Sequence, residues 1–204
     1  FDTYEINVDK VMLYRAIWNV KKGKVGWNTT FGNITSFFDV LSRNNDGTAT
    51  KLEVVNGVFR RAFLALGMCV KSFPFTTRVV GLDACHVKAS YGGVVLVMTV
   101  LDGNGQVFPS AIGVVESENQ DTWSWFLSLV RMAFHLENGK SVVFMSDGEK
   151  GIENAIALLF PEAAHSYCVY HIQKNVKVHF KTDLNGLLFK AAKAASRAEF
   201  KEIR

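Results

Sequence analysis

The segments Arg78-Val-Val-Gly-Leu-Asp83 and Ser141-Val-Val-Phe-Met-Ser-Asp147 decide the fold of this chain. Each is a short apolar run that predicts a buried strand, and each ends in an aspartate. After the first of them, residues 93–101 form an almost wholly apolar run that predicts another strand. Asp102-Gly-Asn-Gly105 then predicts a hairpin turn, because Asp-Gly and Asn-Gly sequences tolerate positive φ angles, and residues 107–115 are the expected return strand.

Helical patterns separate the later strands. Apolar residues at helical spacing predict a helix that starts near Trp123 and ends at Asn138-Gly139, and a second helix that Pro161 stops. A fifth short strand is expected at 164–168. The order from residue 76 is strand, strand, strand, helix, strand, helix, strand, helix. It predicts an α/β fold with a mixed five-stranded sheet and flanking helices.

The rest of the chain divides into two further parts. Residues 1–75 are expected to be mostly helical, with one helix around residues 8–18 and another around 31–41, although residues 52–70 fit a helix or a strand equally well. We therefore expect an N-terminal helical segment at 1–75, a core at 76–175 and the start of a basic helical segment at 176–204. One helix is expected to begin at His171, near the end of the core, and another to run from Leu184 to Arg204.

Composition narrows the class of protein. Hydrophobic residues make up 49% of the 204 residues, which is enough for a substantial core, and the net charge is +4. From His171 onward, eight Lys and Arg residues stand against three acidic residues, so this stretch fits a polyanion partner or a solvated helix face. Three scattered cysteines make no disulfide framework, and we expect no membrane span.

Asp83 and Asp147 are the leading candidates for chemistry. In open α/β sheets, ligands gather at the carboxyl ends of strands. If the two strands are neighbours, the carboxylates converge and repel unless they share a proton or a cation. Hard oxygen ligands suit Mg²⁺ or Mn²⁺. The alternative is that each aspartate only caps a helix or a turn, which is credible for Asp147 before Gly148-Glu149-Lys150.

Several motifs, in order, resemble the Mutator-like element (MULE) transposases of the DDE superfamily. The resemblance is dense from about residue 55 to 204. It is carried by Gly81-Leu-Asp-Ala-Cys-His-Val-Lys88, Tyr91-Gly-Gly93, Leu101-Asp-Gly-Asn-Gly-Gln-Val-Phe-Pro109, Val115-Glu-Ser-Glu-Asn-Gln-Asp-Thr-Trp-Ser-Trp-Phe126, Ser146-Asp-Gly-Glu-Lys-Gly151, Pro161-Glu-Ala-Ala-His165 and Cys168-Val-Tyr-His171 with Asn175.

The resemblance implies a ribonuclease-H-like fold and a DDE-type site with two Mg²⁺ or Mn²⁺ ions. Asp83 matches the first catalytic and metal-binding acid of the family, and Asp147 the second. The third acid, a Glu, follows a helical insertion in this family. The chain ends at Arg204, inside that expected insertion, so we expect the Glu outside the chain and expect no DNA cleavage by the chain alone. Gly148 also departs from the family, where Arg is common at this position.

Other residues are weaker candidates. Cys168 and His171 form a C-x-x-H pair that lies close to the catalytic region in the family; its role is open, and we expect no structural zinc because no second pair completes four ligands. His86 either touches DNA, orients Asp83 or is structural. We favour helix caps over site-supporting acids for Glu116 and Glu118. The candidate DNA contacts are His86, Lys88, Lys174, Lys177 and Lys181.

The implied function is metal-dependent DNA strand cleavage and transfer by a transposase. Its partner is double-stranded DNA, both transposon ends and target, with self-association in the full protein and a nuclear location. The alternative is a domesticated or inactive copy that acts as a DNA-binding regulator, since such a copy keeps the fold without the chemistry.

Overall fold

A single mixed sheet organises the protein. The computed structural model describes residues 27–88, 92–181, 184 and 186–203. Seven strands lie in the order β1-β2-β5-β4-β3-β6-β7. Their bounds are β1 Ala49–Val55, β2 Val58–Ala65, β3 Val79–His86, β4 Val94–Leu101, β5 Val107–Val115, β6 Val143–Ser146 and β7 Ala164–Tyr167. The pairs β1–β2, β2–β5, β5–β4 and β4–β3 are antiparallel, whereas β3–β6 and β6–β7 are parallel.

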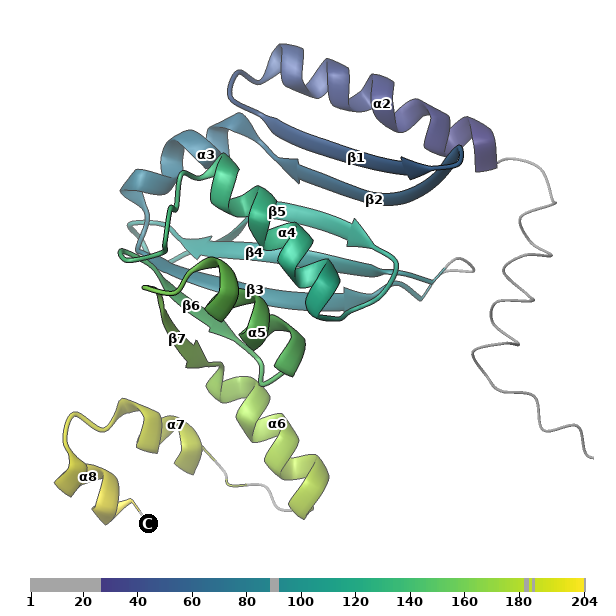
Figure 1. The fold of residues 1–204 in the computed structure, drawn as a ribbon. Coiled ribbons are helices and arrows are strands. Elements are labelled where there is room, and N and C mark those ends of the chain that lie inside the picture. Colours follow the sequence, from purple (N-terminus) through teal and green to yellow (C-terminus); the bar gives the residue numbers. More distant parts are fainter. Residues whose placement is uncertain (1–26, 89–91, 182–183, 185, 204) are drawn as a thin grey trace, which may run out of the picture.

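Helices α4 (Gln120–Ala133) and α5 (Lys150–Leu159) lie side by side over one face of this sheet (Figure 1). The burial of β4 alternates residue by residue, so that Leu96 and Met98 are buried while Val95 and Val97 are half-buried. The buried residues pack beneath the apolar sides of the two helices; the largest fully buried side chains of this core are Trp123, Phe63, Phe73, Phe126, Phe144 and Phe160. This face is therefore the principal core of the protein.

The remaining helices lie around the edges of the sheet. Helix α2 (Trp27–Asn44) runs alongside the β1–β2 hairpin, and α3 (Gly67–Ser72) with the short 3₁₀ turn η1 (Phe73–Phe75) leads into β3 (Figure 1). At the opposite edge, α6 (Val169–Phe180) extends away from β7 and is followed by α7 (Leu187–Lys193) and α8 (Arg197–Glu202). No helix in the described part of the chain is both long and apolar enough to cross a bilayer.

The mixed α/β architecture agrees with the sequence, but the expected count of five strands is wrong. The two additional strands, β1 and β2, lie in the N-terminal segment expected to be mostly helical, largely within residues 52–70, where a helix and a strand fitted equally well. The signal for them is Asn56-Gly57, whose φ angles of 52° and 74° form a two-residue hairpin loop between Val55 and Val58. Because Ala62 of β2 pairs with Val114 of β5, the hairpin joins the same sheet.

Other expectations for the elements have mixed outcomes. The helix expected around 31–41 is present as α2, and the Asp102 turn is confirmed, with the carboxylate accepting hydrogen bonds from the backbone N–H groups of Asn104 and Gln106 at 2.8 Å each. The single helix expected from Leu184 is instead two short helices, because Ser196 caps the start of α8. The helix expected around 8–18 lies outside the described residues, and the domain boundaries at 75 and 175 stay predictions.

A close contact between α4 and α5 makes Gly151 sensitive to substitution. A Cβ atom at this position would lie 2.8 Å from the backbone N of Gln120, and backbone atoms cannot move aside as side chains do. We expect Gly151→Ala to lower the free energy of unfolding by about 1–3 kcal/mol, an overpacking cost that exceeds the helix-propensity gain of about 1 kcal/mol. Urea unfolding measures this difference.

Gly148→Ala is the matched control, because a Cβ atom there meets nothing within 4 Å. Its free energy of unfolding should stay within about 0.5 kcal/mol of the wild type. Equal stability of the Gly151→Ala protein and the wild type would contradict the close contact.

Candidate functional site

The parallel pairing of β3 with β6 brings Asp83 and Asp147 to the same end of the sheet. Val79 pairs with Val143, and the register continues to Gly81 with Met145. Asp83 lies two residues after Gly81, and Asp147 lies two residues after Met145. Since neighbouring strands lie about 4.8 Å apart, the two aspartates stand next to each other at the ends of β3 and β6, the fifth and sixth strands in the order of the sheet.

Both carboxylates are accessible, and neither caps a helix. Asp83 is exposed and Asp147 is half-buried. The Asp83 Oδ1 atom accepts a hydrogen bond from the Ala84 N–H at 2.8 Å, and the Asp147 Oδ1 atom accepts one from the Glu149 N–H at 3.3 Å. Helix α5 begins after Glu149, so the alternative of Asp147 as its N-cap does not hold.

The pair offers two carboxylates to a divalent cation, which fits part of a metal site. Carboxylate oxygens are the ligands that Mg²⁺ and Mn²⁺ prefer. Among the residues that the structure describes, no group of three His, Cys, Asp or Glu side chains is placed to hold a metal ion. The described residues therefore offer two neighbouring carboxylates there and not a complete metal site.

Glu118 lies near Asp147, on the loop between β5 and α4. Its side chain is only 17% exposed; Oε1 accepts a hydrogen bond from Trp123 Nε1 at 3.3 Å, and Oε2 lies 3.9 Å from His86 Nε2. Burial raises the pKa of the Glu118 carboxyl, and the negative charges of Asp147 and Glu149 raise this pKa further. The preference for Glu118 as a helix cap is wrong, because Asn119 caps α4 through a capping box with Thr122.

Glu116 is not a cap either, because it binds a buried arginine. Arg61 of β2 is 4% exposed, and its Nε and Nη2 atoms donate to the Glu116 carboxylate at 2.8 and 2.6 Å. Nη2 also donates to Asp121 Oδ2 at 2.5 Å, and the guanidinium lies 5.6 Å from the centre of the Trp125 ring. The hydrogen bonds from Arg61 hold the pKa of Glu116 below its usual value. No motif in the sequence singles out Arg61.

The Asp147 backbone is supported from β7. The buried Ser146 hydroxyl donates to the Asp147 carbonyl oxygen at 2.7 Å and lies 2.9 Å from His165 Nε2. Cys168 is the first residue after β7, and its N–H donates to the Ser146 carbonyl oxygen at 2.7 Å. Cys168 therefore lies beside Asp147 at the start of α6, and His171 follows in the first helical turn with its Nδ1 atom buried and without a hydrogen-bond partner among the described residues.

The predicted DNA-contacting residues lie in two places. His86 and Lys88, at the end of β3 and just after it, are near Asp83, with His86 exposed and Lys88 exposed. Lys174 and Lys177 are three residues apart, which places them on one side of α6, and Lys181 follows the helix as its C-cap in a left-handed conformation. His86 and Lys88 therefore lie three and five residues beyond Asp83 along the chain, at the same end of β3, while α6 extends away from the sheet (Figure 1).

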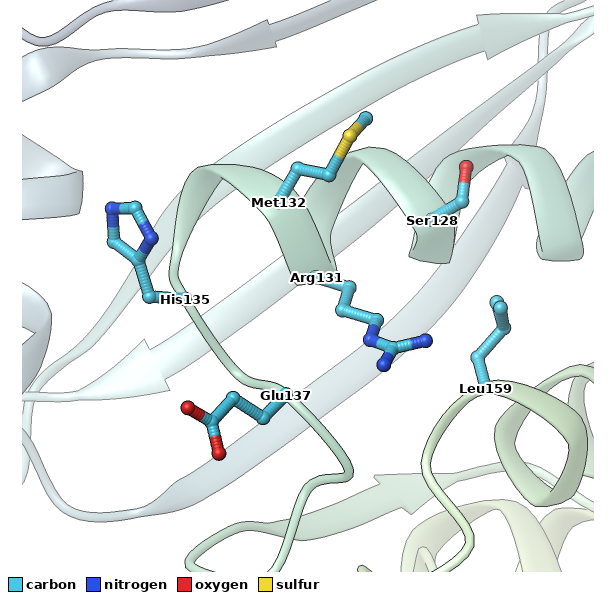
Figure 2. Close-up of a pocket in the computed structure, with 6 residues that line it drawn as sticks. All are labelled: Ser128, Arg131, Met132, His135, Glu137 and Leu159. Carbon is cyan, nitrogen blue, oxygen red and sulfur yellow. The ribbon is translucent and has the colours of Figure 1, made fainter.

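A shallow hollow of about 430 Å³ lies elsewhere. Its walls come from the C-terminal end of α4, the following loop and the end of α5; the residues are Ser128, Arg131, Met132, His135, Glu137 and Leu159 (Figure 2). Helix α4 rises about 1.5 Å per residue, so its 14 residues separate this hollow from Glu118 by roughly 20 Å. The hollow is not part of the aspartate site.

Comparison with known protein families finds a match over the centre of the chain. Residues 79–175 match the MULE transposase domain. This segment runs from the start of β3 into α6 and contains both aspartates and the Cys168–His171 pair. The match confirms the resemblance drawn from the sequence motifs and implies a transposase-related function and interaction with DNA. No curated protein matches the chain.

The ion pair between Arg61 and Glu116 makes stability depend on pH. The folded-state pKa of Glu116 lies below the usual value of 4.5, so the stabilisation is fully present above about pH 4.5 and is lost as the pH falls through the lowered folded-state pKa. We expect Glu116→Gln to lower the free energy of unfolding at pH 7 by no more than about 1 kcal/mol, since the Glu116 side chain is 40% exposed. Urea unfolding over a pH series would show the two proteins converging at low pH, whereas a constant gap down to pH 3 would contradict this assignment.

Proposed function

Because residues 79–175 match the MULE transposase domain, we propose that this chain carries the catalytic core of a DDE-type DNA transposase. The reaction would be metal-dependent cleavage and transfer of DNA strands. One observation carries the proposal: within the matched segment, Asp83 and Asp147 stand at the ends of β3 and β6, which are adjacent and parallel. These two residues are the ones that match the acids of the family motifs.

The sheet topology supports a ribonuclease-H-like assignment of the core. Within the matched segment the strand order is β5-β4-β3-β6-β7, so the first strand is central, and it pairs in parallel with the fourth. Adjacency of the first and fourth strands is what the family resemblance implies for this fold. The β1–β2 hairpin extends the sheet beyond β5 without changing this arrangement.

Asp83 and Asp147 would hold Mg²⁺ or Mn²⁺ in this proposal. A bound divalent cation would lower the pKa of a water molecule and stabilise negative charge on the leaving oxygen in phosphoryl transfer. The chain's own residues bind and orient: the hydroxyl of Ser146 fixes the backbone at Asp147, and Glu118 faces His86 at the edge of the site. The third acid, a Glu in this family, is proposed to lie outside this chain.

DNA is the proposed partner, with its phosphates close to the basic side chains. His86 ends the strand that carries Asp83 and Lys88 follows it, and the α6 lysines would add contacts along the path leading away from β7. Each phosphate contact adds salt-dependent, sequence-independent affinity. The same proposal places the protein in the nucleus, bound to transposon ends and target DNA, and self-associated in its full form.

A DNA-binding regulator that has lost catalysis is the second candidate. One observation favours it: Gly148 follows Asp147 where Arg is common in the family, so a cationic side chain next to the site is missing. Such a protein would retain the fold and the basic surface. The binding of Mn²⁺ at the aspartates separates the two candidates.

We expect the chain to bind Mn²⁺ through the aspartates. Asp83→Asn and Asp147→Asn each remove a charged ligand and should weaken Mn²⁺ binding at least about tenfold, because even changes behind the ligands of metal sites cost about 10- to 100-fold. Electron paramagnetic resonance of free Mn²⁺ measures the dissociation constant. Asp102→Asn, in the hairpin turn, is the control and should bind like the wild type. Equal Mn²⁺ affinity in all four proteins, together with intact DNA binding, would favour the regulator.

We also expect the α6 lysines to contribute to binding of double-stranded DNA. Replacing Lys174, Lys177 and Lys181 with Gln should weaken binding and reduce the slope of log K against log salt by about 0.9 for each phosphate that the variant no longer neutralises. Fluorescence anisotropy at several salt concentrations measures both quantities. Lys51→Gln, an exposed lysine of β1, is the matched control. A triple variant with the wild-type affinity and slope would remove α6 from the DNA-binding surface.

A further inference from the structure

The loop from Glu116 to Asp121 concentrates negative charge next to the aspartate site. Its three acidic residues are Glu116, Glu118 and Asp121, and the charges of Asp147 and Glu149 act on Glu118. Like charges brought together in a partly buried place repel and destabilise the loop unless a cation neutralises them. The conformation of this loop therefore needs a positive charge from elsewhere in the protein.

Arg61 supplies that charge from outside the matched transposase segment. It lies in β2, one residue before the β2–β5 pairing that begins at Ala62 with Val114, so its side chain reaches the point where β5 ends. One guanidinium holds Glu116 at the start of the loop and Asp121 in the first turn of α4, with donor–acceptor distances of 2.5–2.8 Å. A planar fork of donors can bind two carboxylates at once, which a lysine ammonium does less well.

The two anchored acids flank Glu118. Between them, the capping box of Asn119 and Thr122 fixes the backbone, and Trp123 Nε1 holds the Glu118 carboxylate at 3.3 Å. Few conformations are therefore left to the Glu118 side chain, and its second oxygen faces His86. Arg61 is buried, but Glu116 and Asp121 are 40% and 74% exposed, so these ion pairs stabilise the fold weakly, and their main effect is to fix the geometry of the loop.

We propose that Arg61 is a positioning residue for the aspartate site: acting through Glu116 and Asp121, it sets the loop that places the Glu118 carboxylate against His86 and beside Asp147. This inference rests on the proposed function, since the site is the one built on Asp83 and Asp147. It assigns a role in that site to the N-terminal hairpin, which lies outside residues 79–175.

The test follows two signals in the ¹H–¹⁵N spectrum of the 204-residue chain: the Trp123 indole N–H, which is bonded to Glu118, and the His86 imidazole, which faces it. Glu118→Gln defines how both signals move when the Glu118 charge is removed. Arg61→Met, which keeps an apolar stem but removes the guanidinium, should move both signals in the same direction. Arg61→Lys should restore them in part, because it keeps the charge and one of the partners.

Arg60→Met is the matched control. Arg60 is the neighbouring arginine on β2, half-exposed and 3.5 Å from Glu116, and its removal should leave both signals in place. If Arg61→Met lowers the melting temperature but leaves the Trp123 and His86 signals of the folded protein unchanged, Arg61 only stabilises the fold and the inference is overturned.

Two further measurements cover the case of an Arg61→Met protein that does not fold and the metal site itself. If Arg61→Met does not fold, Glu116→Gln and Asp121→Asn each remove one partner of Arg61, and unchanged signals in both variants overturn the inference. Added Mn²⁺ should broaden the His86 signal in the wild type, and less so in Asp83→Asn. Absence of broadening in the wild type would count against the proposed metal site alone, since the signal shifts without metal still decide the role of Arg61.

Discussion

The parallel register between β3 and β6 is the constraint on which the rest of the structure depends. The two strands share only three paired positions, from Val79 with Val143 to Gly81 with Met145. So short a ladder holds its register because the alternate residues, Val80 and Phe144, are fully buried beneath the helices. A slip of one residue would turn these side chains away from the core. The same register that buries them also sets Asp83 beside Asp147.

The acidic residues in and around the aspartate pair differ in whether a cationic side chain of the protein neutralises them. The acids of the loop before α4 are balanced by the protein itself, since Arg61 binds Glu116 and Asp121. Asp83 and Asp147 have no ion-pair partner in the part of the chain that the structure describes. Adjacent carboxylates without a cation from the protein repel each other, and the proposed divalent cation would relieve this repulsion.

The sequence predicts the central part of the fold because that part depends on local patterns. Apolar runs, the Asp102-Gly-Asn-Gly105 turn and helical spacing each act over a few residues, and the strands and helices from 79 to 167 follow them. The β1–β2 hairpin also has a local signal, Asn56-Gly57, but the mixed apolar and basic residues around it fit a helix as well as a strand. Pairing with β5 resolves that ambiguity, and such pairing cannot be read from either segment alone.

The arrangement around Glu118 cannot be predicted from local patterns. Arg61 binds Glu116 and Asp121 across 55 and 60 residues of sequence. Asn119 takes the capping role that was expected of the two glutamates.

The matched segment is therefore smaller than the structural unit that shapes its site, since residues 79–175 carry the aspartates but not Arg61. Without β2, strand β5 would become an edge of the sheet, Phe63 would be missing from the core beside Phe126, and Glu116 and Asp121 would lose their cation. Strand β1 follows by the same reasoning, because it pairs along the length of β2 and its Glu53 accepts a hydrogen bond from Trp125 of α4 at 2.7 Å. The hairpin thus contacts α4 through Glu53, Arg61 and Phe63, and it contributes, together with the matched segment, to the positions of the acidic residues.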